Sequence, residues 1–181
     1  MPQTLWTIGH STRPIDEFVS LLNAHDIQRL VDVRTIPRSR YNPQFNTEVL
    51  AHSLASAAVS YQHSASLGGL RKPQKNSINT GWRNKSFRGY ADYMQTSECW
   101  RALEALMADS RELRTAIMCA EAVPWRCHRC LIADALLTRD WEVRHIMSET
   151  KADQHQLTSF ATVVDGLLRY PDPNAAPRLF P

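Results

Sequence analysis

The sequence predicts a single α/β domain with a mostly parallel sheet of about five strands and helices on both faces. Short apolar runs typical of strands alternate along the chain with segments whose apolar residues recur at helical spacing. The first links between them are short, and strand–helix–strand units of this kind form parallel pairs. With 181 residues, of which 43% are hydrophobic, the chain can bury one core without disulfides or a structural metal.

The first three elements form a βαβ unit. Residues 5–8 are a short apolar run that ends at a glycine. Pro14 suits the first turn of a helix, and the spacing of the apolar residues predicts that this helix extends to about residue 25. Residues 29–33 are apolar again and predict the second strand.

The next part of the chain contains two loops. A polar loop at 34–45 contains two prolines and precedes a helix at 47–58, for which Thr47 is a candidate N-cap. Residues 59–63 predict the third strand. Residues 64–88 have no clear periodicity, and loops of that length are usually functional or partly disordered.

The remaining elements continue the alternation. A helix is expected at 89–109, in two pieces broken near Ser97, followed by a buried strand at 113–118. A helix at 124–138 and an alternating strand at 141–147 come next.

The C-terminal part ends the predicted domain. Helical spacing favours a last helix at 155–168. The domain is then expected to cover residues 1–169, and residues 170–181, with four prolines, are predicted to form an extended surface tail. No internal repeat or change in composition indicates a second domain.

The charges are distributed unevenly although the net charge is only +3. From Arg34 to Arg88 there are nine basic residues and one acidic residue, a net charge of +8, which leaves −5 for the rest. Such an asymmetry favours a phosphate-bearing small molecule or a nucleic acid as partner. The alternative is a solvated loop whose charges pair with acids elsewhere in the fold.

The sequence also predicts where the protein resides. No apolar run of about 18 residues is present, so neither a transmembrane helix nor a membrane partner is expected. The first residues lack the basic and apolar regions of a signal peptide. Four cysteines without a secretion signal then favour reduced thiols in the cytoplasm.

Chemically versatile residues follow several of the predicted strands. In a parallel sheet the carboxyl ends of the strands meet at one edge, which is where α/β proteins bind ligands. We therefore expect residues that are distant in the sequence to converge there. They are His10, Arg34, His63, Cys119 and Glu121.

Other residues near these strand ends are candidates for anion binding. Ser11 precedes a helix, where it can cap the helix or help to hold an anion. Asp32 can pair with Arg34 or Arg38 and so hold an arginine fork ready for a phosphate. Gly68 and Gly69 can let backbone amides approach an anion. Arg71 follows that turn, and Tyr90 either stacks on a base or anchors the loop to the core.

The most informative stretch is Cys119-Ala-Glu-Ala-Val-Pro-Trp-Arg-Cys-His-Arg-Cys130, between a buried strand and a helix. Cys127 is expected near a helix N-terminus and close to Arg126 and Arg129. The positive charge of these groups lowers the pKa of the thiol and favours a thiolate. Either Cys127 or Cys119 could be a nucleophile, and the acid–base could be His128, His10 or Glu121.

Two further mechanisms are open for this stretch. Cys127 and Cys130 have the spacing of a thiol–disulfide redox pair. Zinc could bind Cys119, Cys127, His128 and Cys130, but their spacing matches no common zinc pattern, and no metal site is predicted. The alternative for Cys130 is a small apolar residue on the buried face of the helix.

Five motifs occur together and in order along the chain. They are Ile8-Gly-His-Ser11, Asp32-Val-Arg34 with Pro37 and Arg38, Leu67-Gly-Gly69 with Arg71, Phe87-Arg-Gly-Tyr-Ala-Asp-Tyr93, and Cys119-Ala-Glu121 with Cys127-His-Arg129. Together they resemble the DUF488 family of bacterial and archaeal proteins over about residues 4–150. The resemblance implies a small cytoplasmic α/β domain with the motifs as its site, but no particular reaction or cofactor. In that family the position of Cys130 is commonly not cysteine, which argues against the redox pair.

We therefore predict an enzyme that acts on a phosphate-bearing or nucleotide-like substrate. The catalytic candidates are Cys119, Glu121, Cys127, His128 and His10. The candidates for binding the substrate are Ser11, Asp32, Arg34, Arg38, Gly68, Gly69, Arg71, Tyr90 and Arg129. A nucleic-acid-binding module and a thiol redox protein are the alternatives.

Overall fold

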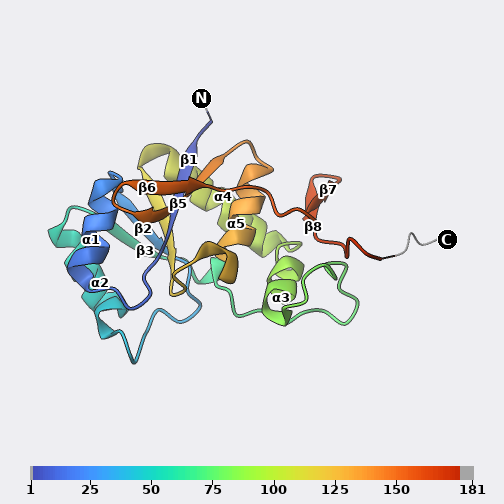
Figure 1. Ribbon diagram of the computed structural model, residues 1–181, viewed down its shortest axis with the longest axis horizontal. Coiled ribbons are helices and arrows are strands. Elements are labelled where there is room, and N and C mark those ends of the chain that lie inside the picture. Colours follow the sequence, from blue (N-terminus) through green and yellow to red (C-terminus); the bar gives the residue numbers. More distant parts are fainter. Residues whose placement is uncertain (1, 176–181) are drawn as a thin grey trace.

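A computed structural model describes residues 2–175, and its main feature is a six-stranded sheet of order β3-β2-β4-β1-β5-β6 (Figure 1). Strands β1 to β5 are parallel, which confirms the predicted mostly parallel sheet. Strand β6 was not predicted, and it pairs antiparallel with β5 after a tight turn. The bounds are β1 Thr4–Gly9, β2 Arg29–Asp32, β3 Ser60–His63, β4 Thr115–Cys119, β5 Glu142–Ser148 and β6 Lys151–Gln154.

Helices cover both faces of the sheet, as predicted (Figure 1). Helices α1 and α2 pack against one face, where the sheet contributes Trp6 and Ile8. Helices α3, α4 and α5 pack on the other face, to which Leu5 and Val31 belong. Successive residues of a strand thus enter different cores, as expected for a parallel sheet buried on both sides. The bounds are α1 Ile15–Ala24, α2 Thr47–Ser56, α3 Lys85–Tyr93, α4 Ser97–Glu112 and α5 Arg129–Leu137.

The connections diverge between the central strands β1 and β4. These two strands are neighbours, but β1 leads to α1 on one face and β4 leads to α5 on the other. Open α/β sheets form a ligand-binding crevice at such a point, outside the carboxyl ends of the strands. The topology therefore places the ends of β1 and β4 at the expected position of a site.

The predicted helix at 155–168 is wrong. Its place is taken by an extended segment and a separate two-stranded hairpin of β7 Thr162–Val164 and β8 Leu167–Arg169. The turn residues Asp165 and Gly166 have φ angles of 52° and 76°. Asp-Gly favours such positive φ values in tight hairpin turns, so the local turn chemistry outweighed the helical spacing.

Several predicted boundaries also shift. Helix α3 begins before residue 89 because the side chain of Asn84 caps it, and the predicted break near Ser97 is confirmed, with Thr96 capping α4. Thr47 does not cap α2, since its hydroxyl donates to the carbonyl of Pro37. The segment at 124–138 splits into a 3-10 helix, Pro124–Arg126, and α5. Two more 3-10 turns occupy Pro43–Phe45 and Ala65–Leu67.

The C-terminal segment is only partly a surface tail. The side chain of Tyr170 is buried, and its hydroxyl donates to Asp134. Residues 171–175 are exposed, whereas the rest of the predicted tail, 176–181, lies outside the described residues. Among residues 2–175, no helix is long and apolar enough to cross a bilayer.

Candidate active site

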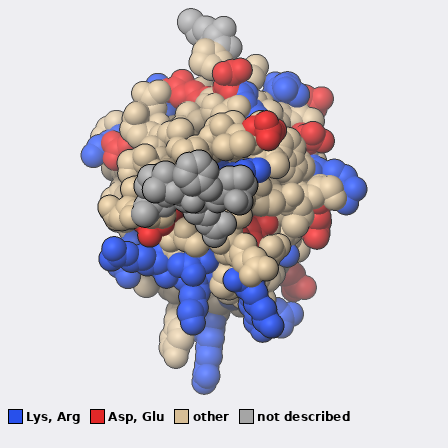
Figure 2. Space-filling view, turned by 90° about the vertical axis from the view of Figure 1, so that its right-hand side faces the viewer, with Lys and Arg blue, Asp and Glu red and all other residues tan. Residues whose placement is uncertain are grey.

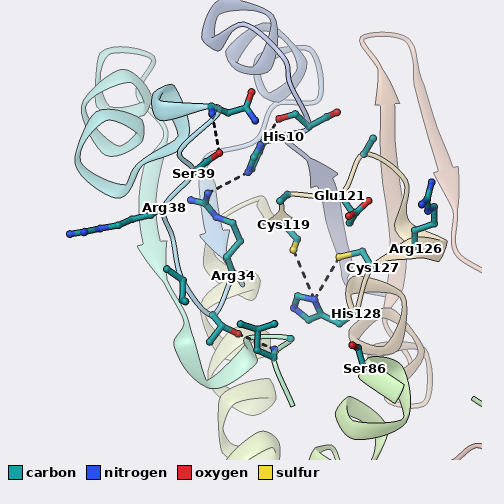
Figure 3. Close-up of a pocket in the computed structure, with 18 of the residues that line it drawn as sticks. His10, Arg34, Arg38, Ser39, Ser86, Cys119, Glu121, Arg126, Cys127 and His128 are labelled. Carbon is teal, nitrogen blue, oxygen red and sulfur yellow. Dashed lines mark hydrogen bonds between the residues drawn. The ribbon is translucent and has the colours of Figure 1, made fainter. Parts of the chain in front are cut away.

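A cavity of about 670 Å³ lies at the carboxyl ends of β1, β2 and β4, where the connections diverge (Figure 3). Nine of the sequence-predicted site residues line it: His10, Ser11, Arg34, Arg38, Gly69, Cys119, Glu121, Cys127 and His128. Five others lie outside its lining: Asp32, Gly68, Arg71, Tyr90 and Arg129. His63 also stays outside the lining, and its Nε2 hydrogen-bonds the backbone carbonyl of Arg34 at 2.8 Å.

Gly9 allows the two walls of the cavity to approach each other. A Cβ atom at this position would lie 1.8 Å from the backbone oxygen of Glu121, so no other residue fits. The pairing of β1 with β4 continues beyond the strands, because the amides of His10 and Ser11 donate to the carbonyls of Cys119 and Ala120. The turn after β1 and the loop after β4 therefore form one continuous rim.

The first wall is built around a buried ion pair between Asp32 and Arg34. Arg34 Nη2 lies 2.6 Å from Asp32 Oδ2, and Arg34 Nε lies 2.9 Å from Oδ1. Tyr61 adds a hydrogen bond of 2.8 Å to the same carboxylate. Asp32 thus pairs with Arg34, one of the two partners that the sequence allowed, and fixes the guanidinium at the cavity.

His10 completes this wall. Its Nε2 lies 3.3 Å from Arg34 Nη1, its Nδ1 lies 2.7 Å from the carbonyl oxygen of Ser11, and its ring stacks on Phe45. Burial lowers the pKa of His10 to about 4, so its imidazole is neutral at pH 7. A neutral ring that donates from Nδ1 and accepts at Nε2 satisfies both contacts.

The second wall holds a compact group of two thiols and one imidazole. His128 Nδ1 lies 3.7 Å from Cys127 Sγ and 4.0 Å from Cys119 Sγ (Figure 3). His128 Nε2 lies 3.0 Å from the carbonyl oxygen of Val33, to which it donates. Because Nε2 makes this bond, Nδ1 is the ring nitrogen that faces the two sulfur atoms. We call Cys119, Cys127 and His128 the Cys–Cys–His group.

The two thiols have opposite acid–base properties. A hydrogen bond from Cys119 lowers the pKa of Cys127 well below its ordinary value, helped by His128 and Arg129. The same hydrogen bond raises the pKa of Cys119. Cys127 is therefore the thiolate of the group, and Cys119 keeps its proton and donates it.

Arg129 supports Cys127 from behind. The side chain is buried, with Nε 3.4 Å from Cys127 Sγ and Nη2 2.6 Å from the backbone oxygen of Glu121. Its third contact, from Nη1 to Thr7 Oγ1, measures 3.3 Å. Arg129 was predicted to bind the substrate, but in the structure it holds the thiolate and the loop after β4.

A chain of buried hydrogen bonds continues from Arg129 through the core. Thr7 Oγ1 lies 2.7 Å from His145 Nδ1, and His145 Nε2 lies 2.9 Å from His155 Nδ1. The chain ends at Asp134, whose Oδ1 lies 2.8 Å from His155 Nε2. Burial lowers the pKa of His145 to about 3, so its imidazole is neutral at pH 7.

The Gly68-Gly69 turn closes the cavity beside His128. A Cβ atom on Gly69 would lie 2.5 Å from His128 Nδ1, so a side chain there would displace the ring. Arg71 holds this turn through Nε to the carbonyl of Gly68, and its guanidinium stacks on Tyr93. The hydroxyl of Tyr90 donates to the carbonyl of Leu67. Tyr90 and Arg71 thus both hydrogen-bond the backbone of this loop.

The rim of the cavity carries the exposed charges. Arg38 and Arg126 are exposed, and in Figure 3 both extend outward on opposite sides of the opening. Neither forms an ion pair with any described residue. Glu121 is exposed on the same wall as the thiols. The sequence did not indicate the polar lining residues Ser39, Asn42 and Ser86, which lie on aperiodic loops or at a helix start.

Comparison with known proteins places the chain in a family. The family model described as "Domain of unknown function DUF488" matches residues 14–136, more than half of the chain. The match includes the Cys–Cys–His group, Asp32 and Arg34, whereas His10 lies outside it. Neither the curated proteins nor the solved structures gave a match. The chain therefore belongs to the DUF488 family.

Proposed function

We propose that the protein is an enzyme that acts on a phosphate-bearing, nucleotide-like substrate, with the Cys–Cys–His group as its chemical centre. One observation supports this most strongly: two thiols, one of them with a depressed pKa, and an imidazole face a cavity whose rim carries two arginines that form no ion pair within residues 2–175. Strongly perturbed pKa values in a cleft are typical of active sites. The free thiols also fit a reducing, cytoplasm-like compartment.

The two walls have different roles in this proposal. On the wall of β4 and α5, Cys127 supplies the thiolate, Cys119 and His128 adjust its protonation, and Glu121 is the exposed acid–base group. On the wall of β1 and β2, His10 and Arg34 present a neutral imidazole and a fixed guanidinium to the substrate. The cavity of about 670 Å³ has the size of a small-molecule site.

Arg38 and Arg126 are expected to bind the anionic part of the substrate. We predict that Arg38→Ala and Arg126→Ala each weaken binding of inorganic pyrophosphate about fivefold, because an exposed charge contact contributes roughly 1 kcal/mol. The measurement is isothermal titration calorimetry at low salt with the full chain. Arg40→Ala is the matched control, since Arg40 is exposed and basic but does not line the cavity. Equal losses in all three variants would contradict a specific anion site.

Nucleic-acid binding is the second candidate function, and the distribution of charge favours it. Figure 2 shows Lys and Arg side chains gathered at the lower end of the molecule, the end at which α3 lies in Figure 1. The exposed basic residues of the positively charged segment are Arg38, Arg40, Lys72, Lys75, Arg83 and Lys85. An oligonucleotide that binds through this surface would lose affinity steeply with salt, and Arg40→Ala would weaken it as much as Arg38→Ala.

The geometry gives less support to a thiol redox pair of Cys127 and Cys130. Cys130 lies in α5 and lines a different cavity, of about 380 Å³, together with His145 and His155. Burial raises the pKa of the Cys130 thiol to about 12, so it is protonated at neutral pH. The thiol that accompanies Cys127 in the active-site cavity is Cys119.

A further inference from the structure

We propose that Cys119, Cys127 and His128 form a binding site for one divalent transition metal of the zinc class, with a fourth coordination position open to the cavity. This inference rests on the proposed function only in taking this cavity as the active site. It adds a cofactor and a class of chemistry, namely activation of a metal-bound water. Neither the family description nor the sequence spacing assigns such a site.

The distances between the three donor atoms suit a single metal ion. All three atoms lie within 4.8 Å of one another, with separations of 3.7 Å and 4.0 Å from His128 Nδ1 to the two sulfurs. In a tetrahedral zinc site, with bonds of about 2.3 Å to sulfur and 2.0 Å to nitrogen, neighbouring donors are about 3.5–3.8 Å apart. The two nitrogen–sulfur separations would therefore need to contract by only about 0.2–0.5 Å to reach coordination geometry.

The hydrogen bonds around the group also suit a metal site. The Nε2 atom of His128 donates to the carbonyl of Val33, which fixes the ring and leaves Nδ1 free as a ligand. Metal-binding histidines almost always use their second nitrogen in this way. The Nε atom of Arg129 donates to the sulfur of Cys127. Binding of a divalent ion would release the proton of Cys119, because thiol ligands must be deprotonated, and the two thiolates would then balance the charge of the ion.

Three protein ligands and an open side are typical of catalytic zinc sites. Structural zinc sites are closed by four protein ligands, whereas catalytic sites keep one position for water. Among the described residues, the potential ligands in this group are Cys119, Cys127 and His128 alone, and all three line the cavity. The fourth position of a bound ion therefore faces the space assigned to the substrate.

Glu121 occupies the place of a proton acceptor beside such a site. It follows the ligand Cys119 by two residues, it is exposed, and it lines the same cavity as Cys127 (Figure 3). A glutamate that is not itself a ligand acts as general acid–base next to zinc in Cys/His-coordinated hydrolytic sites. With an ion held by Cys119, Cys127 and His128, the metal would supply an activated water at the cavity, and the Glu121 carboxylate would be placed to accept a proton from it.

The test uses the full chain, stripped of metal with a chelator and then titrated with Zn²⁺ or Co²⁺. We expect one ion per chain, and with Co²⁺ the intense absorption of a tetrahedral thiolate site. Cys119→Ser and Cys127→Ser should each weaken Co²⁺ binding more than about 100-fold. Losing a residue that only hydrogen-bonds a metal ligand already weakens binding by up to about 100-fold, and losing the ligand itself should cost more. Cys130→Ser is the matched control and should bind as the wild type does, because Cys130 lies outside the group.

Wild-type protein alone also tests the site if a variant fails to fold, because the cobalt spectrum reports thiolate ligands directly. The site is overturned if the wild type binds less than one Co²⁺ per chain without thiolate absorption, or if Cys130→Ser removes binding. The same titration followed by pyrophosphate calorimetry separates the two proposals. A protein that binds pyrophosphate through Arg38 and Arg126 but takes up no metal retains the proposed function and excludes the metal site.

Discussion

Replacing Asp134 by Ala should lower the free energy of unfolding by about 3–5 kcal/mol, because it leaves several buried polar groups without a partner. The carboxylate is fully buried and accepts bonds from His155 Nε2, the amide of Thr158 and the hydroxyl of Tyr170. These groups lie on different segments of the C-terminal third, so Asp134 ties that region to α5. Urea unfolding at pH 7, followed by circular dichroism, measures the effect.

Two controls distinguish this network from an ordinary surface charge. Glu104→Ala removes an exposed carboxylate of helix α4 and should change stability by no more than about 0.5 kcal/mol. Asp134→Asn keeps an oxygen acceptor and should lose less stability than Asp134→Ala. If Asp134→Ala costs as little as Glu104→Ala, the buried chain that leads to Arg129 does not hold the core together.

Asp32→Ala is the second change with a large expected effect, again about 3–5 kcal/mol of unfolding free energy. It leaves the guanidinium of Arg34 without its counter-charge in a position where the side chain is only 6% exposed. It also removes the acceptor for the Tyr61 hydroxyl. Because Arg34 carries the wall that faces the thiols, we expect pyrophosphate binding to be lost together with stability. Chemical denaturation and calorimetry on the same samples measure both.

The chain offers a matched control for this ion pair. Arg144 and Glu142 are also 2.6 Å apart, but the Arg144 side chain is 45% exposed. Glu142→Ala should therefore cost at most about 1 kcal/mol, since exposed ion pairs contribute little. In addition, Asp32→Ala combined with Arg34→Met should be more stable than Asp32→Ala alone, because no charge is then buried. A double variant no more stable than the single one would show that the loss comes from packing.

The fold could be predicted from the sequence where hydrophobic periodicity dominates. Strands β1, β2, β4 and β5 are short apolar or alternating runs, and both faces of the sheet are covered as expected. The last predicted helix failed because the Asp165-Gly166 turn favours a hairpin, a local preference that apolar spacing does not report. Strand β6 was missed because it is a polar edge strand held by backbone pairing with β5.

The candidate site could be predicted only as far as the parallel sheet determines it. Residues that end β1, β2 and β4 must meet at one edge, so the convergence of His10, Arg34 and Cys119 followed from topology. The direction in which each side chain points depends on tertiary packing, which the hydrophobic pattern of the sequence does not determine. In the structure Arg129 contacts the sulfur of Cys127 and Arg71 contacts the Gly68-Gly69 turn, whereas the sequence suggested substrate contacts from their charge alone.

The most direct test of the account is the rate at which iodoacetamide alkylates Cys127 in metal-free protein, measured against pH by peptide mass spectrometry. Because the pKa of Cys127 is depressed in the folded state, its thiolate persists as the pH falls below that of an ordinary thiol, about 8.5. We predict that the alkylation rate stays constant as the pH is lowered well below 8.5. Pyrophosphate should slow alkylation in the wild type but not in the double variant Arg38→Ala/Arg126→Ala. A rate that falls with a midpoint near pH 8.5 and is unaffected by pyrophosphate would contradict a thiolate at the centre of an anion-binding active site.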